Sequence, residues 1–133
     1  MNTNKTSTSP TVEQFKQALL ALRPVSPKHL AMLKAHFNAP VREMTATQLA
    51  EAAGYANYAA VNMQYGTFAK SIAEHLGLGA PMQSEAGDPV WTSVIASGAA
   101  GSADSPHYVW TLRPELVAAL TELPWGFVKK KPA

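Results

Sequence analysis

Hydrophobic residues in the first half of the chain recur every three to four positions, which is the period of an amphipathic helix. This spacing predicts helices over residues 11–23, 26–38, 45–54 and 57–76. The predicted apolar faces consist of Phe15, Ala18, Leu19, Leu22, Leu30, Leu33, Phe37, Leu49, Ala52, Ala53, Tyr58, Val61, Tyr65, Phe68, Ile72 and Leu76.

Local signals mark where these helices begin and end. Residues 11–14 and 45–48 each carry Thr followed three positions later by Gln, which is a capping-box pattern. Ser26 is a favourable N-cap, and the proline after it suits the first helical position because no N–H donor is needed there. Gly54 is predicted to end the third helix in the left-handed conformation. The third and fourth helices therefore form a predicted helix–turn–helix.

The second half of the chain is richer in residues that favour strands. Segments 90–97 and 107–113 contain many β-branched and aromatic residues and predict a hairpin around a loop at 98–106. A last helix is predicted over residues 113–123, with a proline near its start. The predicted fold class is mainly α with a small β-hairpin, an α+β domain. A helix–turn–helix followed by a hairpin is the outline of a winged-helix-like domain.

One domain is predicted over residues 11–128, between a flexible polar tail at 1–10 and a basic tail at 129–133. The chain has 133 residues, of which 47% are hydrophobic, which suits a single domain with its own core. It contains no cysteine, so disulfides and cysteine-based metal sites are excluded. No apolar run approaches the about 20 residues of a membrane span, and the N-terminus lacks the apolar core of a secretory signal. A cytoplasmic protein is the simplest interpretation.

The fourth predicted helix occupies the position of a recognition helix, which lies in the major groove and contacts base edges through its N-terminal residues. Asn and Gln side chains there can pair with adenine, while Lys or His further along the helix or on the hairpin can reach phosphate. These features predict a non-catalytic module that binds duplex DNA, modified or unmodified. The candidate contacts are Asn57, Tyr58, Asn62, Gln64, Lys70 and His107.

The charge of the same helix supports an alternative interpretation. Its predicted outward face, which carries one positive and one negative charge, consists of Ala59, Met63, Gly66, Thr67, Lys70 and Glu74. Phosphate contacts supply much of the affinity of DNA-binding proteins, and the formal net charge of this chain is only +2. The face around Met63, Gly66 and Thr67 therefore suits a protein partner or a homodimer equally well. Gly66 inside the helix also indicates close approach of another backbone.

Candidate catalytic and metal-binding groups are few. His29 and His36 lie seven positions apart, about 10 Å along a helix, which is too far to share one metal ion without a third element. Both are interpreted as surface side chains. Ser102 and Asp104 lie near His107, but a flexible loop supplies neither a rigid scaffold nor an oxyanion hole. The sequence therefore predicts no enzyme activity, no cofactor and no metal site.

Three other groups of residues have open interpretations. Tyr108 and Trp110 share one side of a predicted strand, where they either pack in the core or form a stacking platform for a flipped base. The basic residues Lys28, Lys34 and Arg42 are interpreted as solvated faces, or as one basic edge together with the two histidines of the same helix. The three lysines of the C-terminal tail either follow phosphate or keep the terminus soluble.

Three stretches, SPKHLAMLKAHFNAP, TATQLAEAAGYANYAAVNMQYG and WTLRPELVAALTELPW, resemble a small bacterial domain of uncharacterised proteins and of the non-catalytic part of some HNH-type, modification-linked restriction endonucleases. The resemblance covers about residues 13–128 and implies a bacterial defence context and DNA recognition. The catalytic half and its His–Asn–His cluster are missing, and PWGF departs from the Gly–Trp ending of that domain. A free-standing copy is then a recognition subunit, or a decoy or inhibitor from a mobile element, such as an anti-CRISPR or anti-restriction protein.

Overall fold

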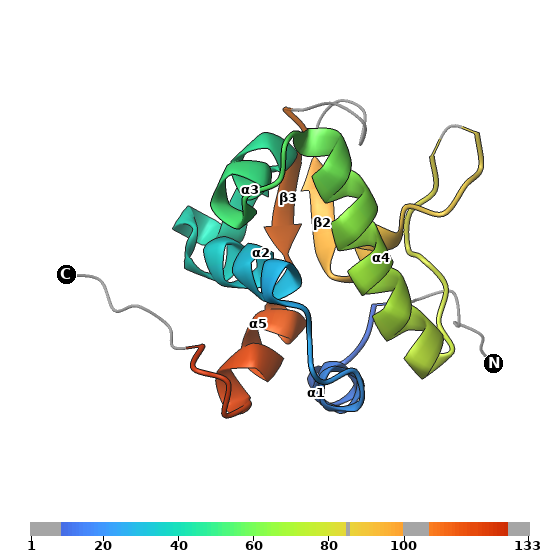
Figure 1. The fold of residues 1–133 in the computed structure, drawn as a ribbon. Coiled ribbons are helices and arrows are strands. Elements are labelled where there is room, and N and C mark those ends of the chain that lie inside the picture. The colour runs from blue at the N-terminus through green and yellow to red at the C-terminus, as the bar shows by residue number, and fades with distance from the viewer. Residues whose placement is uncertain (1–8, 85, 100–106, 128–133) are drawn as a thin grey trace.

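The computed structural model describes residues 9–84, 86–99 and 107–127, which form five α-helices and a three-stranded antiparallel sheet (Figure 1). In chain order the elements are α1 (Val12–Ala21), α2 (Pro27–Asn38), the 3-10 helix η2 (Pro40–Arg42), β1 (Glu43–Thr45), α3 (Ala46–Ala53), α4 (Tyr58–Leu76), the 3-10 helix η3 (Trp91–Val94), β2 (Ala96–Ala99), β3 (Val109–Leu112) and α5 (Pro114–Glu122). The mainly helical α+β class predicted from the sequence is confirmed. Of the two predicted tails, only Ser9 and Pro10 lie within the described residues.

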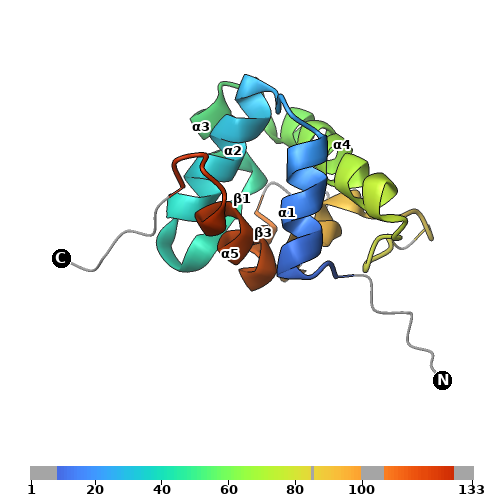
Figure 2. The same cartoon turned by 90° about the horizontal axis from the view of Figure 1, so that it is seen from below.

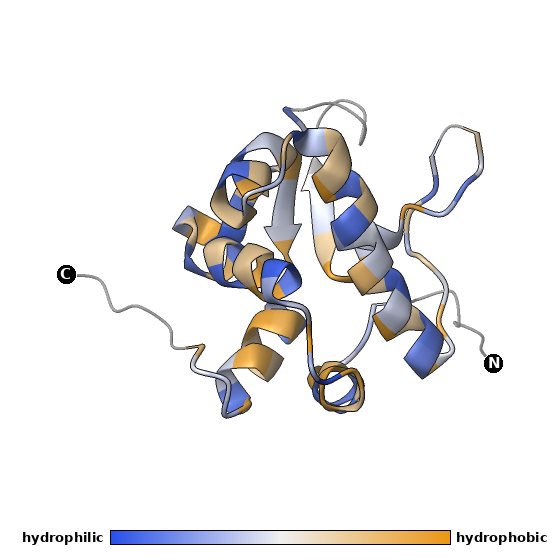
Figure 3. Ribbon diagram, in the orientation of Figure 1, coloured by the Kyte–Doolittle hydropathy of each residue, from blue (hydrophilic) through white to orange (hydrophobic). Residues whose placement is uncertain are grey.

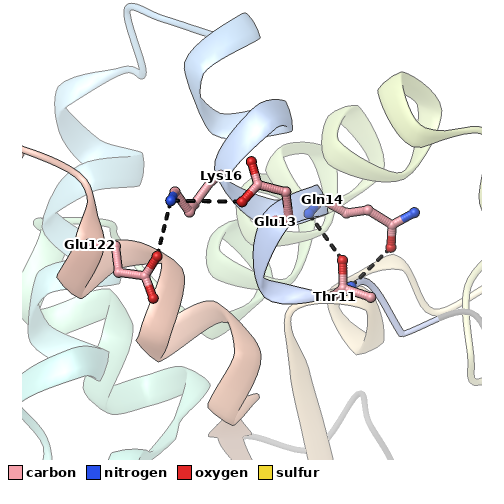
Figure 4. Close-up of polar contacts among 5 residues, drawn as sticks. All are labelled: Thr11, Glu13, Gln14, Lys16 and Glu122. Atoms are coloured by element: carbon pink, nitrogen blue, oxygen red, sulfur yellow. Dashed lines mark hydrogen bonds and ion pairs between the residues drawn. The ribbon is translucent and has the colours of Figure 1, made fainter.

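The helix ends agree with the local signals in the sequence. Thr11 Oγ1 accepts a hydrogen bond from the backbone N–H of Gln14 at 3.1 Å, and Gln14 Oε1 accepts from the N–H of Thr11 at 2.9 Å (Figure 4). The same reciprocal capping box begins α3 at Thr45, and Ser26 caps α2. Gly54 ends α3 with φ 79°, in the left-handed region. Four residues then separate α3 from α4, so the helix–turn segment forms where it was predicted.

Helices α1 and α5 come from opposite ends of the chain and pack together, as the view in Figure 2 shows. Lys16 of α1 links them, because its Nζ lies 3.0 Å from Glu122 Oε1 of α5 and 3.8 Å from Glu13 Oε1 (Figure 4). The hydrogen bond to Glu122 raises the pKa of Lys16. This lysine is therefore part of the helix packing and is already paired with carboxylates.

The sheet has the strand order β1-β3-β2, so the central strand is the last one in the chain. The predicted hairpin is confirmed by the pairing of β2 with β3, whereas β1 is an additional strand that the sequence analysis did not predict. The prediction of a strand over residues 90–97 was wrong in its first half, because Trp91–Val94 forms the 3-10 helix η3. Packing of η3 against α4 outweighs the intrinsic preference of its residues for a strand.

Helix α4 carries one continuous buried stripe, formed by Val61, Tyr65, Phe68, Ala69, Ile72 and Ala73. Figure 3 shows apolar and polar segments alternating along its ribbon. Tyr108, just before β3, and Trp110 in β3 are 5% and 3% exposed, which confirms the core interpretation and excludes a stacking platform. In α3 the prediction of Ala52 as an inward residue was wrong, because Ala52 is exposed and Ala50 is buried instead. Among the described residues, no helix is long and apolar enough to cross a membrane.

A polar network is enclosed within this apolar core. The ring of His36 in α2 lies 2.8 Å from the hydroxyl of Tyr65 through Nδ1 and 2.8 Å from the carbonyl oxygen of Trp110 through Nε2. A carbonyl can only accept, so Nε2 carries the proton, and the Tyr65 hydroxyl donates to Nδ1. The prediction of His36 as a surface residue was wrong, since its side chain is fully buried. The network joins α2, α4 and the central strand.

Candidate functional site

The predicted DNA contacts on α4 do not form one face of the helix. Asn62 and Gln64 are two positions apart, which turns their side chains by about 200° around the helix axis. Both are half-buried, and they lie on opposite flanks of the buried stripe. The structure therefore separates the predicted contacts into an N-terminal group, two flanks and an outward face.

The N-terminal group lies where α4 begins. Asn57 is the N-cap, and its Oδ1 accepts a hydrogen bond from the backbone N–H of Ala60 at 3.0 Å. Tyr58 is half-buried and packs on the core, while His107 is exposed just before β3. In Figure 1 the start of α4 and the loop end of the β2–β3 hairpin lie at the same end of the molecule. The structure thus brings Asn57, Tyr58 and His107 to one end.

Lys28, at the start of α2, is a basic residue that contacts the turn between α3 and α4. Its Nζ donates to the carbonyl oxygen of Gly54 at 3.0 Å and lies 4.5 Å from the ring centroid of Tyr55. Lys28 is therefore held against the turn that precedes α4. The two residues that it touches lie 26 and 27 positions further along the chain, so no local pattern in the sequence pointed to this contact.

Gln64 is directed away from the outward face of α4, toward the start of α2. Its Oε1 accepts a hydrogen bond from His29 Nε2 at 3.0 Å, and the His29 ring lies 5.5 Å from that of Phe68. The His29 ring thus lies against α4, which separates it from the alternative of one basic edge. A shallow pocket of about 130 Å³ opens beside it, smaller than the about 300 Å³ of most ligand sites. It is lined by Leu22, Pro24, Val25, Ser26, His29, Phe68 and Ser71.

The outward face of α4 is neutral and partly apolar. Met63 is 66% exposed, and the hydroxyl of Thr67 donates to the Met63 carbonyl oxygen at 2.8 Å, so it is turned onto its own helix. Lys70 Nζ lies 4.0 Å from Glu74 Oε2 and 5.7 Å from the ring centroid of Trp91. Lys70 also lies 13 positions, or about 20 Å, from Asn57 along the axis. It is therefore remote from the N-terminal group and paired with a carboxylate.

Gly66 does not belong to this outward face, contrary to the prediction. It is half-buried on the flank that packs against η3, and a Cβ added there would lie 3.7 Å from Thr92 Oγ1. That separation is an ordinary van der Waals contact with a side chain, so the expected close approach of another backbone was also wrong. The exposed interaction face is thus centred on Met63 and Thr67.

Among the described residues, the buried pair of His36 and Tyr65 shows the largest pKa shifts. Burial lowers the pKa of His36 to about 4, although the carbonyl of Trp110 acts in the opposite direction, and burial raises the pKa of Tyr65. With exposures of 0% and 1%, neither side chain can meet a reactant, so the pair is structural. Within the described ranges, no group of three or more His, Asp or Glu side chains is arranged to hold a metal ion. Ser102 and Asp104 lie outside those ranges.

Comparisons of this chain with models of protein families, with curated proteins and with solved structures found no match. The candidate site is therefore defined by its geometry alone. It consists of the end of the molecule where α4 begins, with Asn57 and Tyr58, of Lys28 against the turn that precedes α4, and of the separate neutral face around Met63.

Proposed function

We propose that this protein is a non-catalytic DNA-binding module of the winged-helix type. The surface that would contact DNA is the end of the molecule where α4 begins and the β2–β3 loop leaves the sheet. Asn57 and Tyr58 would approach base edges, with Lys28 and His107 directed toward phosphate. The resemblance of the sequence to the non-catalytic part of restriction endonucleases suggests a role in bacterial defence or in its regulation.

The observation that carries this proposal is the pairing of β1 with β3. A strand that precedes a helix–turn–helix and pairs with the second strand of a following hairpin is the arrangement of winged-helix domains. In Figure 1 the end of β2 and the start of β3 lie at the same end of the molecule as the N-terminus of α4, which is the second helix of this arrangement. Fold alone does not establish function, so the proposal depends on the residues at this end.

Substitution of Asn57 by Asp tests the proposed surface without removing the helix cap. Asp retains the oxygen that caps α4 and is favourable at a helix N-terminus, but it removes an amide donor and adds a negative charge. We expect Asn57→Asp to weaken binding of labelled duplex DNA by about tenfold or more, measured by fluorescence anisotropy across a salt series. The melting temperature of Asn57→Asp should equal that of the wild type within experimental error.

Thr11→Asp is the matched control, because it places the same residue at the N-cap of α1, at the other end of the molecule in Figure 1. Both variants change the net charge by the same amount, so a general charge effect would weaken them equally. Equal affinities of the two variants would therefore remove the start of α4 from consideration. Absence of wild-type binding at low salt would end the DNA proposal for the duplex tested.

The neutral face of α4 supports a second candidate function, association of two copies of this chain. Met63 is 66% exposed, and the two charged residues of the outward face of α4, Lys70 and Glu74, are paired with each other. Such a face favours contact with another protein over contact with phosphate, because it offers apolar area and no unpaired positive charge. We propose that in this case the two copies pack their α4 helices against each other around Met63.

Met63→Lys should then shift the protein from a dimer to a monomer of 14.2 kDa in sedimentation equilibrium. The buried charge would oppose burial of the face, while an exposed helical position accepts lysine without loss of stability. Leu20→Lys is the control, since Leu20 is an exposed hydrophobic residue on a different helix, α1. A wild type that is monomeric throughout the concentration range, or a Met63→Lys variant that still dimerises, would contradict this candidate.

A further inference from the structure

The first turns of α4 present an uncharged, apolar face to solvent. Ala59, Ala60 and Met63 lie within about 100° of one another around the helix axis. Ala59 and Met63 are exposed and Ala60 is half-buried, and residues 58–69 include no charged side chain. We call Ala59, Ala60 and Met63 the alanine–methionine face. It follows directly after Asn57, at the end of α4 that the proposed function directs toward DNA.

The absence of charge on the alanine–methionine face disfavours contact with phosphate but not contact with base edges. Phosphate contacts rely mainly on cations, whereas sequence is read by hydrogen bonds and apolar contacts to the bases. Two polar side chains that border the face are engaged within the protein. The Thr67 hydroxyl donates to the Met63 carbonyl oxygen at 2.8 Å, and Gln64 Oε1 accepts from His29 Nε2 at 3.0 Å. The face itself therefore offers methyl groups and a thioether.

The major groove of DNA admits a helix, and each base pair presents a different pattern of groups there. Thymine presents a C5-methyl group, cytosine an amino donor and guanine two acceptors. An apolar face that covered the polar groups of a G·C pair would remove their water without replacing its hydrogen bonds. Ala59 and Met63 are about 6 Å apart along the helix axis, close to two base-pair steps of about 3.4 Å. The chemistry and the length of the face thus suit the methyl groups of thymine.

Asn57 favours thymine over cytosine for a separate reason. Its Oδ1 accepts the hydrogen bond that caps α4, from the backbone N–H of Ala60 at 3.0 Å. The group that Asn57 then offers to a base is its amide NH₂, which is a donor. Thymine O4 and adenine N7 accept hydrogen bonds in the major groove, whereas the amino group of cytosine donates. A cytosine that carried a C5-methyl group would therefore still oppose one donor to another.

We propose that the alanine–methionine face selects A·T base pairs, by packing on the C5-methyl groups of thymine while Asn57 donates to an acceptor of an A·T pair. This inference rests on the DNA binding proposed above and names the bases that this surface selects. Met63 makes the main contact, because its flexible and polarisable side chain is 66% exposed and adapts to the shape of its partner. Ala and Thr methyl groups make the same kind of contact with thymine in DNA-binding proteins.

Three duplexes of equal length and phosphate charge test the proposal by fluorescence anisotropy. The first alternates A and T, the second replaces thymine by uracil, and the third alternates G and 5-methylcytosine. Uracil retains O4 and lacks only the C5-methyl group. We expect the wild type to bind the A·T duplex about fourfold more tightly than the A·U duplex for each methyl group that it buries. The third duplex carries as many methyl groups as the first, and we expect weaker binding to it because of its amino donors.

Met63→Gln tests which side chain makes the contact, because glutamine keeps the length and helix propensity of methionine but has a polar end. The ratio of the affinities for the A·T and A·U duplexes should fall toward one in this variant. Leu20→Gln is the matched control, since it makes a comparable change at an exposed hydrophobic residue of α1. It should keep the ratio of the wild type.

The outcomes separate this inference from the proposed function. Salt-dependent binding of the wild type to A·T and A·U with equal affinity would overturn the thymine contact and leave DNA binding standing. The same ratio in wild type and Met63→Gln would overturn the assignment of the contact to the alanine–methionine face. Equal binding to A·T and G·5-methylcytosine would overturn the selection of thymine. Absence of binding to all three duplexes at low salt would contradict both the inference and the proposed function.

Discussion

Lowering the pH from 7 to 4 is expected to reduce the free energy of unfolding by about 3 kcal/mol through His36 alone. In the folded protein the pKa of His36 is lowered to about 4, chiefly because burial disfavours the charged ring. In the unfolded chain the pKa of histidine is about 6.5. The unfolded state therefore binds a proton between these two values that the folded state excludes, so stability is complete above pH 6.5 and falls as the pH falls toward 4.

The physical reason is the closed network around the ring. Nε2–H donates to the Trp110 carbonyl and Nδ1 accepts from Tyr65, so both nitrogens of the neutral ring are satisfied. Protonation would put a second donor opposite the Tyr65 hydroxyl in an apolar core, where an uncompensated charge is costly. The hydroxyl cannot relieve this by ionising, because burial also raises its pKa.

His36→Gln isolates this contribution from that of the carboxylates, which titrate in both proteins. We expect the variant to be less stable than the wild type at pH 7 by about 1–3 kcal/mol, because its amide cannot reproduce both hydrogen bonds. The difference between the two proteins should shrink as the pH falls to 4, in urea denaturation followed by tryptophan fluorescence. His75→Gln, at an exposed position of α4, should keep the wild-type profile. A difference between wild type and His36→Gln that is constant with pH would contradict the assignment.

The helix ends and the position of His36 show how far the sequence determines this fold. Thr11, Ser26, Thr45 and Gly54 act within one turn of the chain, so their roles could be predicted from neighbouring residues alone. The burial of His36 also had a local signal, because it follows Leu33 by three positions on the apolar face of α2. Its two partners lie 29 and 74 positions away, and their alignment with the ring depends on the whole fold.

The failure to predict strand β1, and the separation of the predicted DNA contacts around α4, have a different cause. Strand β1 has only three residues, Glu43–Thr45, too few for an alternating pattern, and it exists because β3 offers a free edge. The sequence correctly placed Asn57 at the start of α4, but it could not show that Gln64 is engaged by His29. The sequence also could not show that Lys28 contacts the turn between α3 and α4, because packing of the core sets how α2 lies against these helices.

Gly98→Ala is expected to destabilise the protein by about 1–3 kcal/mol, the range for overpacking in a well-packed interior. Gly98 in β2 is the cross-strand partner of Trp110, and a Cβ built on it would overlap the ring and hydroxyl of Tyr108. The Tyr108 ring has little freedom to withdraw. It packs edge to face on Trp110 with centroids 4.9 Å apart, and its hydroxyl lies 3.8 Å from the sulfur of Met82. The control is Ser97→Ala at the adjacent exposed position, which should change stability by less than about 0.5 kcal/mol.

A double-mutant cycle with Tyr108→Ala then identifies what the glycine is needed for. Gly98 does not adopt the left-handed backbone conformation, so a side chain there is excluded by the Tyr108 ring and not by the backbone. In the Tyr108→Ala background the cost of Gly98→Ala should therefore disappear, in urea denaturation of all four proteins, and the coupling energy should equal most of the single-mutant effect. An equal cost in both backgrounds would show instead that the strand itself requires glycine. Because Gly98 and Trp110 are partners in the β2–β3 pairing, this contact also fixes the hairpin from which the proposed DNA-binding surface is built.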